Sequence, residues 1–276
     1  MPPFRNRLRT PEFSRRKRRT LYIKLFLAVV LLSGIVGALS YVAHRDAFRI
    51  QQIVIEGGEV VDEEGLIALM KAELSGKYLF LFPKDNAFMY SRRGLEATAL
   101  ESFKRLATVQ VETRGLQNVV LVVSERIPHA LWCGENRPEG DLTVQCYFMD
   151  ADGYIYTEAP AFTGDVYLRF YGPLTSGEPI GQLYLPSSRF QEFQTLFADL
   201  GGKGVQVAEF VLVGEGSYEM YLEDGTKVLF SDGQSLARIF DNLLSVLSSK
   251  ELQDRELLNL EYIDLRFGNK VYFKER

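Results

Sequence analysis

Residues 48–74 read FRIQQIVIEGGEVVDEEGLIALMKAEL and contain two patterns in succession. The first part is rich in β-branched and aromatic residues and stops at the pair Gly57 and Gly58, which predicts a strand. Asp62 then stands where an N-cap residue would open a helix. The apolar residues behind it recur at helical spacing, and they are Leu66, Ile67, Leu69, Met70 and Leu74. The segment therefore predicts a strand that leads into a short helix.

The following residues continue this module. Residues 91–103 predict a second helix, and ATVQVETRG (107–115) and NVVLVVSERIP (118–128) predict two strands joined by a turn. The run Val119–Val123 is apolar on both faces, so we expect its strand to be central in its sheet. KYLFLFPKDNAF (77–88) contains a proline and is too short for a membrane span, so we expect a connector packed on the core. The predicted order is β-α-α-β-β.

The second half of the chain is richer in strands and turns. Short strands are predicted on both sides of a turn at Asp150–Gly153, and helices are predicted over 187–200 and from Ser235 onward. After a short helical stretch, LEYIDLRFGNKVYFK (260–274) predicts a hairpin or a single bent strand, and we expect it at a sheet edge. The predicted fold class is α+β, with a mixed β-rich C-terminal domain that contains two or three helices.

A possible membrane anchor precedes these elements. Residues 1–20 carry eight Lys and Arg against one Glu, and Leu25–Ala43 contains no charged side chain. Nineteen such residues make about 28 Å of helix, which is enough to span a bilayer. The basic side is expected to stay in the cytoplasm, so everything after His44 is expected outside the inner membrane. The alternative is a cleaved signal peptide, but the run exceeds the roughly 7 to 15 residues of its usual apolar core.

Charge is distributed unevenly between the two ends. The first twenty residues carry a formal charge of +7, whereas residues 21–276 carry −11, because they hold 24 basic and 35 acidic side chains. The basic end is suited to anionic lipid headgroups. An acidic main body is repelled from nucleic acid, so we expect no nucleic-acid partner.

The sequence has two cysteines, Cys133 and Cys146. The residues between them are rich in Gly, Asn, Pro and Asp, which predicts a long hairpin loop. On the oxidising side of a membrane, a disulfide at its base would stabilise the fold by about 3 kcal/mol. Two free thiols are the alternative. A metal site would need further ligands, and only His129 is close.

Four segments in this order resemble the FtsQ/DivIB family of bacterial cell-division proteins. They are FRIQQIVIEGGEVVDEEGL (48–66), the strand with its SERIPHA exit (119–130), YFMDADGYIY (147–156) and YIDLRFGN (262–269). The resemblance covers nearly the whole chain. It implies a non-enzymatic scaffold at the division septum that binds small membrane proteins such as FtsB and FtsL and helps to control septal peptidoglycan synthesis. It also implies a single-pass inner-membrane protein without cofactor or small-molecule substrate.

The resemblance also implies a division of the chain. We expect a basic cytoplasmic tail (1–20), a transmembrane helix (21–43), a juxtamembrane linker (44–47), a POTRA-like domain (48–130) and a β domain (131–276).

In that family the last strands bind a segment of FtsB by β-augmentation, in which a partner adds a strand to a sheet edge. The positions here that match this surface are Arg266, Phe267, Asn269, Val271, Tyr272 and Phe273. Strand alternation offers a second interpretation, in which Phe267, Val271 and Phe273 face the core while Arg266, Lys270 and Tyr272 point outward.

Signs of an enzyme are weak. His44 and His129 are the two histidines, and a linker role and a structural role are expected for them. Asp150–Gly153 lacks the ligand spacing of a calcium loop and predicts a turn closed by the Asp150 side chain. The glycines after residue 200 lack the GK[ST] of a P-loop and are expected to end a helix. We expect no catalytic, cofactor-binding or metal-binding residues. The alternative function is a membrane-anchored envelope enzyme or secretion accessory protein that carries a POTRA-like module.

Overall fold

The computed structural model describes residues 11–138, 144–161, 166–214, 216–249, 260–268 and 270–276. Contacts between Cα atoms divide the chain into two compact units. Unit 1 comprises Met1–Glu101 and Thr108–Val123, and unit 2 comprises Ser102–Ala107 and Ser124–Arg276.

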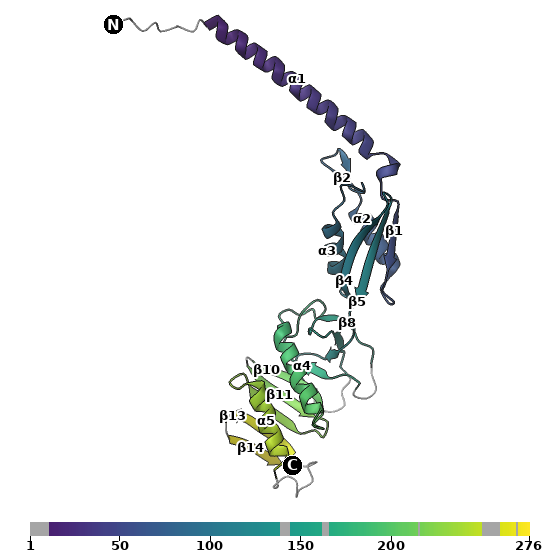
Figure 1. Ribbon diagram of the computed structural model, residues 1–276. Helices are drawn as coiled ribbons and strands as arrows, with labels where there is room; N and C mark the ends of the chain where they lie inside the picture. Colours follow the sequence, from purple (N-terminus) through teal and green to yellow (C-terminus); the bar gives the residue numbers. More distant parts are fainter. Residues whose placement is uncertain (1–10, 139–143, 162–165, 215, 250–259, 269) are drawn as a thin grey trace, which may run out of the picture. The chain divides into compact units, whose positions relative to one another are not determined.

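Unit 1 begins with a long helix, α1 (Pro11–Ala43), drawn in purple in Figure 1. Its part from Arg18 to Ala43 is 26 residues long and apolar enough to cross a membrane. A single 3₁₀ turn, η1 (Asp46–Phe48), separates this helix from the first strand.

The remainder of unit 1 is a three-stranded sheet with two helices. The strands are β1 (Gln52–Glu56), β4 (Leu106–Arg114) and β5 (Asn118–Glu125), in the order β1-β5-β4 with β1 parallel to β5. The central place of β5 was predicted from its apolar run and is confirmed. The helices are α2 (Glu63–Glu73) and α3 (Arg92–Ser102).

The ends of these elements follow from single residues. The Asp62 side chain accepts a hydrogen bond from the Gly65 amide at 3.0 Å, which confirms the predicted N-cap of α2. Gly57 has a φ of +84°, and a Cβ built there would lie 2.3 Å from the Val123 carbonyl oxygen. Only glycine fits where β1 ends so close to β5. Buried side chains form the core, and they include Leu66, Met70, Leu95, Ala99, Val119 and Leu121.

The prediction for residues 77–88 was wrong in part. They form a small antiparallel hairpin, β2 (Lys77–Tyr78) and β3 (Phe82–Pro83), instead of a connector packed wholly on the core. Pro83 is buried, but the turn residues Leu79 and Phe80 are 84% and 94% exposed. Both are the central residues of the turn Tyr78–Leu81 between the paired strands, where their side chains point outward.

Unit 2 is built on a nine-stranded mixed sheet with the order β14-β13-β12-β11-β10-β9-β6-β7-β8. The first seven strands of unit 2 in chain order are β6 (Ala130–Trp132), β7 (Tyr147–Met149), β8 (Ile155–Glu158), β9 (Arg169–Tyr171), β10 (Val207–Gly214), β11 (Ser217–Leu222) and β12 (Lys227–Ser231). The last two are β13 (Leu260–Phe267) and β14 (Lys270–Glu275). The α+β fold class is confirmed.

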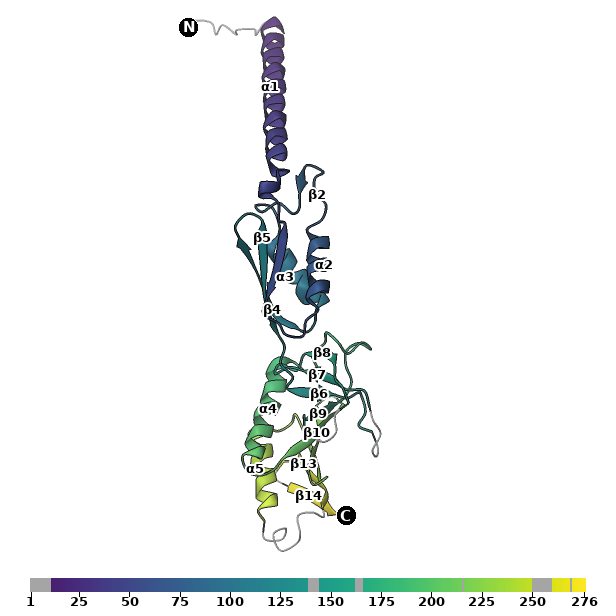
Figure 2. The ribbon, with the colours of Figure 1, turned by 90° about the vertical axis from the view of Figure 1, so that its right-hand side faces the viewer.

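Two helices cover one face of this sheet. They are α4 (Ser187–Gly201) and α5 (Leu236–Leu247), and Figures 1 and 2 show them side by side along the strands. One end of each helix was predicted correctly. Helix α4 ends at the glycines after Leu200, and helix α5 begins after Ser235, whose hydroxyl accepts from the Arg238 amide at 3.3 Å. The short helical stretch predicted before residue 260 lies outside the described residues.

The core between α4 and the sheet is aromatic. Phe193 of α4 lies 4.8 Å from Phe210 of β10 and 4.9 Å from Tyr218 of β11, measured between ring centroids. Phe170 of β9 lies 5.2 Å from Phe190, also on α4. Tilted and edge-on pairs at these distances add to the stability that burial of the rings supplies.

The turn at Asp150–Gly153 is confirmed as a turn closed by its own aspartate. The Asp150 carboxylate accepts hydrogen bonds from the amides of Asp152 and Tyr154 at 2.9 and 3.0 Å, and it pairs with the Arg126 guanidinium. The Asp150 side chain therefore closes the turn and joins it to Arg126.

Candidate partner-binding edge

The last two strands of the chain form the predicted hairpin at the predicted edge. β13 and β14 run antiparallel on either side of Gly268, whose φ is +69°. Within the part of the chain that the structure describes, no strand pairs with the outer side of β14. Such an edge presents main-chain donors and acceptors to which another strand can add.

Most of the predicted site residues are exposed on this hairpin. The exposed fractions of Phe267, Tyr272 and Phe273 are 58%, 50% and 41%. Arg266 is exposed as well, whereas Val271 is partly buried and packs against the core. Asn269 lies outside the described residues, so the structure does not place its side chain.

The interpretation from strand alternation holds for only part of the hairpin. Val271 faces the core, as alternation predicts. Phe267 does not, because its ring meets the Tyr272 ring edge-on at a centroid distance of 5.2 Å. The pairing register shifts between Asp264 and Phe267, which moves Phe267 out of simple alternation.

Asp264 and Arg266 form an ion pair on β13 that supports the exposed end. The Arg266 guanidinium donates from Nε to Oδ1 at 2.9 Å and from Nη2 to Oδ2 at 2.5 Å. The hydrogen bonds from Arg266 lower the pKa of Asp264, and the same contact raises the pKa of Arg266. Asp264 is only 6% exposed, so the pair fixes the Arg266 side chain above a nearly buried carboxylate.

Helix α5 and the residue just before its N-cap hold the hairpin backbone. Gln234 donates from its amide to the Leu265 carbonyl, and Asn242 donates to the Gly268 carbonyl at 3.2 Å. Asn242 therefore reaches the chain at the hairpin turn. Both contacts stabilise the geometry of an edge that has no neighbour of its own on one side among the described strands.

Sequence reasoning missed these supporting residues. Asp264 could have been found, because residues two apart on a strand share a face and the pair in DLR has opposite charges. Gln234 and Asn242 carried no signal, since their contacts join residues that are 31 and 26 positions apart in the chain.

Charges of both signs lie around the edge. Lys270 and Arg276 are exposed, and Lys274 pairs with Glu261 at 2.5 Å across the hairpin.

The opposite end of the sheet contains the two cysteines. The β6–β7 register pairs Trp132 with Tyr147, which brings Cys133 opposite Cys146. The structure joins them, with their Cα atoms 4.1 Å apart. Whether this disulfide forms in the cell stays a prediction. Residues 139–143 of the intervening loop lie outside the described residues.

The two histidines make structural contacts. His129 Nε2 lies 3.2 Å from the Gln194 Oε1 atom, and His44 Nδ1 lies 2.7 Å from the Ser40 carbonyl. Among the residues for which the structure gives positions, no three His, Cys, Asp or Glu side chains cluster in a way that could hold a metal ion.

Comparison with protein families gives a match to part of unit 2. Residues 141–266 match the model described as "Cell division protein FtsQ/DivIB, C-terminal". The match begins before β7 and ends within β13, one residue before Phe267. No curated protein sequence matches the chain. The FtsQ/DivIB family is a non-enzymatic family of division proteins. Residues 141–266 of this chain are therefore similar to the C-terminal domain of FtsQ/DivIB cell-division proteins.

Proposed function

We propose that this chain is a membrane-anchored scaffold of the division machinery at the septum. In this proposal residues 1–20 are a cytoplasmic tail and α1 crosses the inner membrane once. A POTRA-like domain (48–130) and a β domain (131–276) then lie outside it. The basic residues before the apolar run favour this topology, because they hold the N-terminal side in the cytoplasm.

The observation that carries the proposal is the β13–β14 edge within a division-protein domain. An outermost strand with Phe267, Tyr272 and Phe273 exposed is an aggregation hazard unless something covers it. We infer that an extended segment of an FtsB-like protein pairs with β14. Main-chain hydrogen bonds would supply affinity, and the aromatic and basic side chains would select the sequence. Through FtsB- and FtsL-like partners the scaffold would help to control septal peptidoglycan synthesis.

Binding of the full chain in nanodiscs to a peptide from the extracytoplasmic part of the host's FtsB-like protein tests this function. Phe267→Glu places a carboxylate in the proposed interface, and we expect a loss of affinity of at least about tenfold. Val213→Glu is the matched control, because Val213 is also 58% exposed and lies on β10 of the same sheet. Equal loss in both variants, or in neither, would contradict the proposed surface.

A second arm tests the mode of binding. A peptide that is N-methylated at alternate residues lacks the backbone N–H donors along one edge of the strand. We expect one of the two methylation registers to abolish binding and the other to be tolerated, because a strand uses only every second amide toward a given neighbour. Tolerance of both registers would exclude main-chain pairing. If no peptide binds to the wild type, the scaffold assignment itself fails.

A further inference from the structure

The β2–β3 hairpin of unit 1 ends in two apolar side chains with almost no protein contact. Phe80 and Leu79, at 94% and 84%, have the highest exposed fractions among the large apolar side chains that the structure describes. They exceed every apolar side chain of α1, where the largest value is 67%. Exposure of this extent at one turn indicates a surface that another apolar phase covers.

The backbone of this turn is unfavourable for the residues in it. Leu79 and Phe80 have φ values of +49° and +62°, and they are the non-glycine residues with positive φ in the described chain. The Leu81 amide donates to the Tyr78 carbonyl at 3.0 Å, which closes a two-residue turn of the type that prefers Asn-Gly. Strain and apolar exposure therefore coincide, and such a combination is typical of functional positions.

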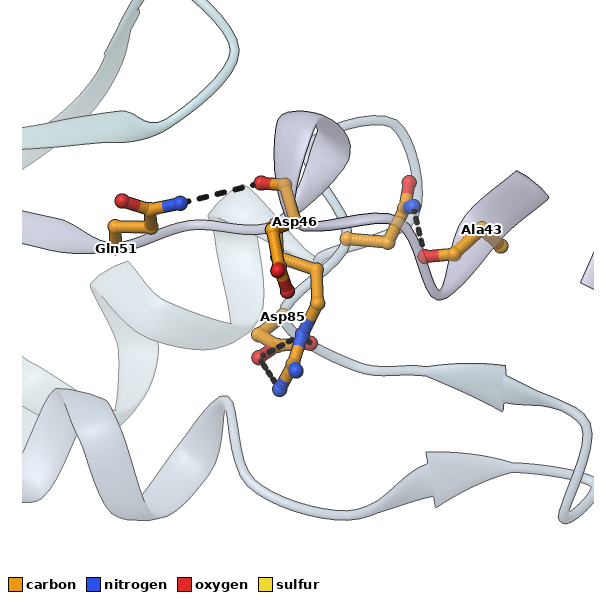
Figure 3. A network of polar contacts seen from close by, with 6 residues as sticks. Ala43, Asp46, Gln51 and Asp85 are labelled. Atoms are coloured by element: carbon orange, nitrogen blue, oxygen red, sulfur yellow. Dashed lines mark hydrogen bonds and ion pairs between the residues drawn. The ribbon is translucent and has the colours of Figure 1, made fainter. Parts of the chain in front are cut away.

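Hydrogen bonds place the turn beside the last part of α1. The Ser40 hydroxyl donates to the Leu81 carbonyl at 2.6 Å, and the Asn86 amide donates to the Ala43 carbonyl at 3.0 Å. Figure 3 shows the second contact next to the Arg49–Asp85 ion pair, whose atoms are 2.6 Å apart. Ser40 lies within the uncharged run Leu25–Ala43. The turn therefore lies next to a segment of α1 that is apolar enough for the core of a bilayer.

Aromatic and basic side chains accompany the turn. The Arg45 guanidinium lies 4.8 Å from the Tyr41 ring centroid, and the Lys84 ammonium lies 5.9 Å from that of Tyr78. Tyrosines with neighbouring Lys and Arg are typical of the level where a bilayer meets water. The hydrogen bonds and these side chains therefore indicate the same boundary.

We propose that the turn Tyr78–Leu81 inserts into the outer leaflet of the bilayer beside α1, with Leu79 and Phe80 among the lipid acyl chains. The proposal rests on the function proposed above, in that α1 must cross the membrane. Insertion gives unit 1 a second attachment to the lipid. It fixes the tilt of the unit relative to the bilayer, which a single helix does not.

Fluorescence quenching by brominated lipids tests the insertion in the full chain. The protein has one tryptophan, Trp132, which is 7% exposed, so the wild type serves as the blank. Phe80→Trp is reconstituted in nanodiscs of phosphatidylcholine and phosphatidylglycerol, with bromines close to the headgroup. Val60→Trp is the matched control, because Val60 is 63% exposed on the loop after β1. Leu32→Trp reports on α1 itself.

We expect at least twofold quenching and a blue shift for Phe80→Trp, and neither for Val60→Trp. Quenching of Leu32→Trp without quenching of Phe80→Trp would overturn the insertion while the anchor stands, and would indicate a protein partner for the turn. If Leu32→Trp is not quenched by lipids that carry bromine deeper in the acyl chain, α1 does not cross the bilayer. The proposed insertion of the turn would then fail as well.

A second pair of variants identifies the side chains responsible. Tyr78→Trp is compared with the same reporter in a chain that also carries Leu79→Asn and Phe80→Gly. The Asn-Gly sequence suits this turn, so the hairpin is kept while its apolar side chains are removed. We expect the quenching of the tryptophan introduced at position 78 to fall at least twofold in the Asn-Gly chain. Unchanged quenching would show that Leu79 and Phe80 do not hold the turn in the lipid.

Discussion

The ring of Phe267 meets the ring of Tyr272 edge-on, with centroids 5.2 Å apart and planes at 85°, across the turn of the terminal hairpin. This pair joins β13 to an outermost strand that has no neighbour on its other side among the described residues. The two rings therefore stabilise the edge and remain half exposed.

A double-mutant cycle measures this pair. We expect Phe267→Ala and Tyr272→Ala to couple by about 0.5–1 kcal/mol in the free energy of unfolding, the usual range for cross-strand aromatic pairs. Phe267→Ala paired with Val213→Ala is the control cycle. Additive effects in the test cycle would mean that the two rings contribute independently.

The Asp264–Arg266 pair makes stability depend on pH. Because Arg266 lowers the pKa of Asp264, the ionised carboxylate stabilises the fold above its unfolded pKa of about 3.9, and this contribution is lost as the pH falls through the lower folded value. We expect Asp264→Asn to lower the free energy of unfolding by about 1 kcal/mol at pH 7, a modest value because Arg266 is exposed. Below about pH 3 the same substitution should lower it by less. Unfolding curves at several pH values measure the difference, and a pH-independent cost would contradict it.

The disulfide should stabilise unit 2 when it is formed. Cys133 and Cys146 are 13 positions apart, and closing a loop of this length is worth about 3 kcal/mol on the chain-entropy model. We expect Cys133→Ala with Cys146→Ala to lower the Tm, and a reductant to lower the Tm of the wild type by a similar amount. If the reductant frees the two thiols of the wild type without lowering its Tm, the disulfide does not stabilise the fold.

The strained turn predicts an uncommon gain in stability. We expect Leu79→Asn with Phe80→Gly to raise the free energy of unfolding by about 1–2 kcal/mol in detergent, because both new residues adopt positive φ more readily. Leu79→Ala with Phe80→Ala is the matched control, since it removes the same apolar side chains and keeps the strain. Hydrogen exchange of the β1 and β5 amides measures both, and equal stability of the two variants would show that the backbone is not strained.

Most elements of the fold were predictable because local signals marked their ends. Asp62 and Ser235 open helices, and the apolar run of β5 indicated its central position. The β2–β3 hairpin was missed because its turn is Leu-Phe, whereas the sequence signal for such a turn is Asn-Gly or a similar pair. Periodicity treats Leu79 and Phe80 as core residues, although nothing in the described part of unit 1 buries them.

The candidate edge was predictable in its position and less so in its side chains. Position follows from the terminal hairpin pattern around Gly268. The direction of each side chain depends on two register shifts in the β13–β14 pairing, and period-two reasoning cannot detect them. The supporting contacts from Gln234 and Asn242 depend on tertiary packing and could not be inferred from neighbouring residues.

The bond from Asn86 to the Ala43 carbonyl has a mechanical consequence. It ties the final turn of α1 to the loop after β3 in the same unit, and the Gln117 amide donates to the Asp46 carbonyl, three residues after Ala43, at 3.1 Å. The connection consequently has little torsional freedom. If α1 crosses the membrane as proposed and another helix rotates it about its axis, the rest of unit 1 turns with it. Contacts made inside the membrane would then reorient a surface outside it.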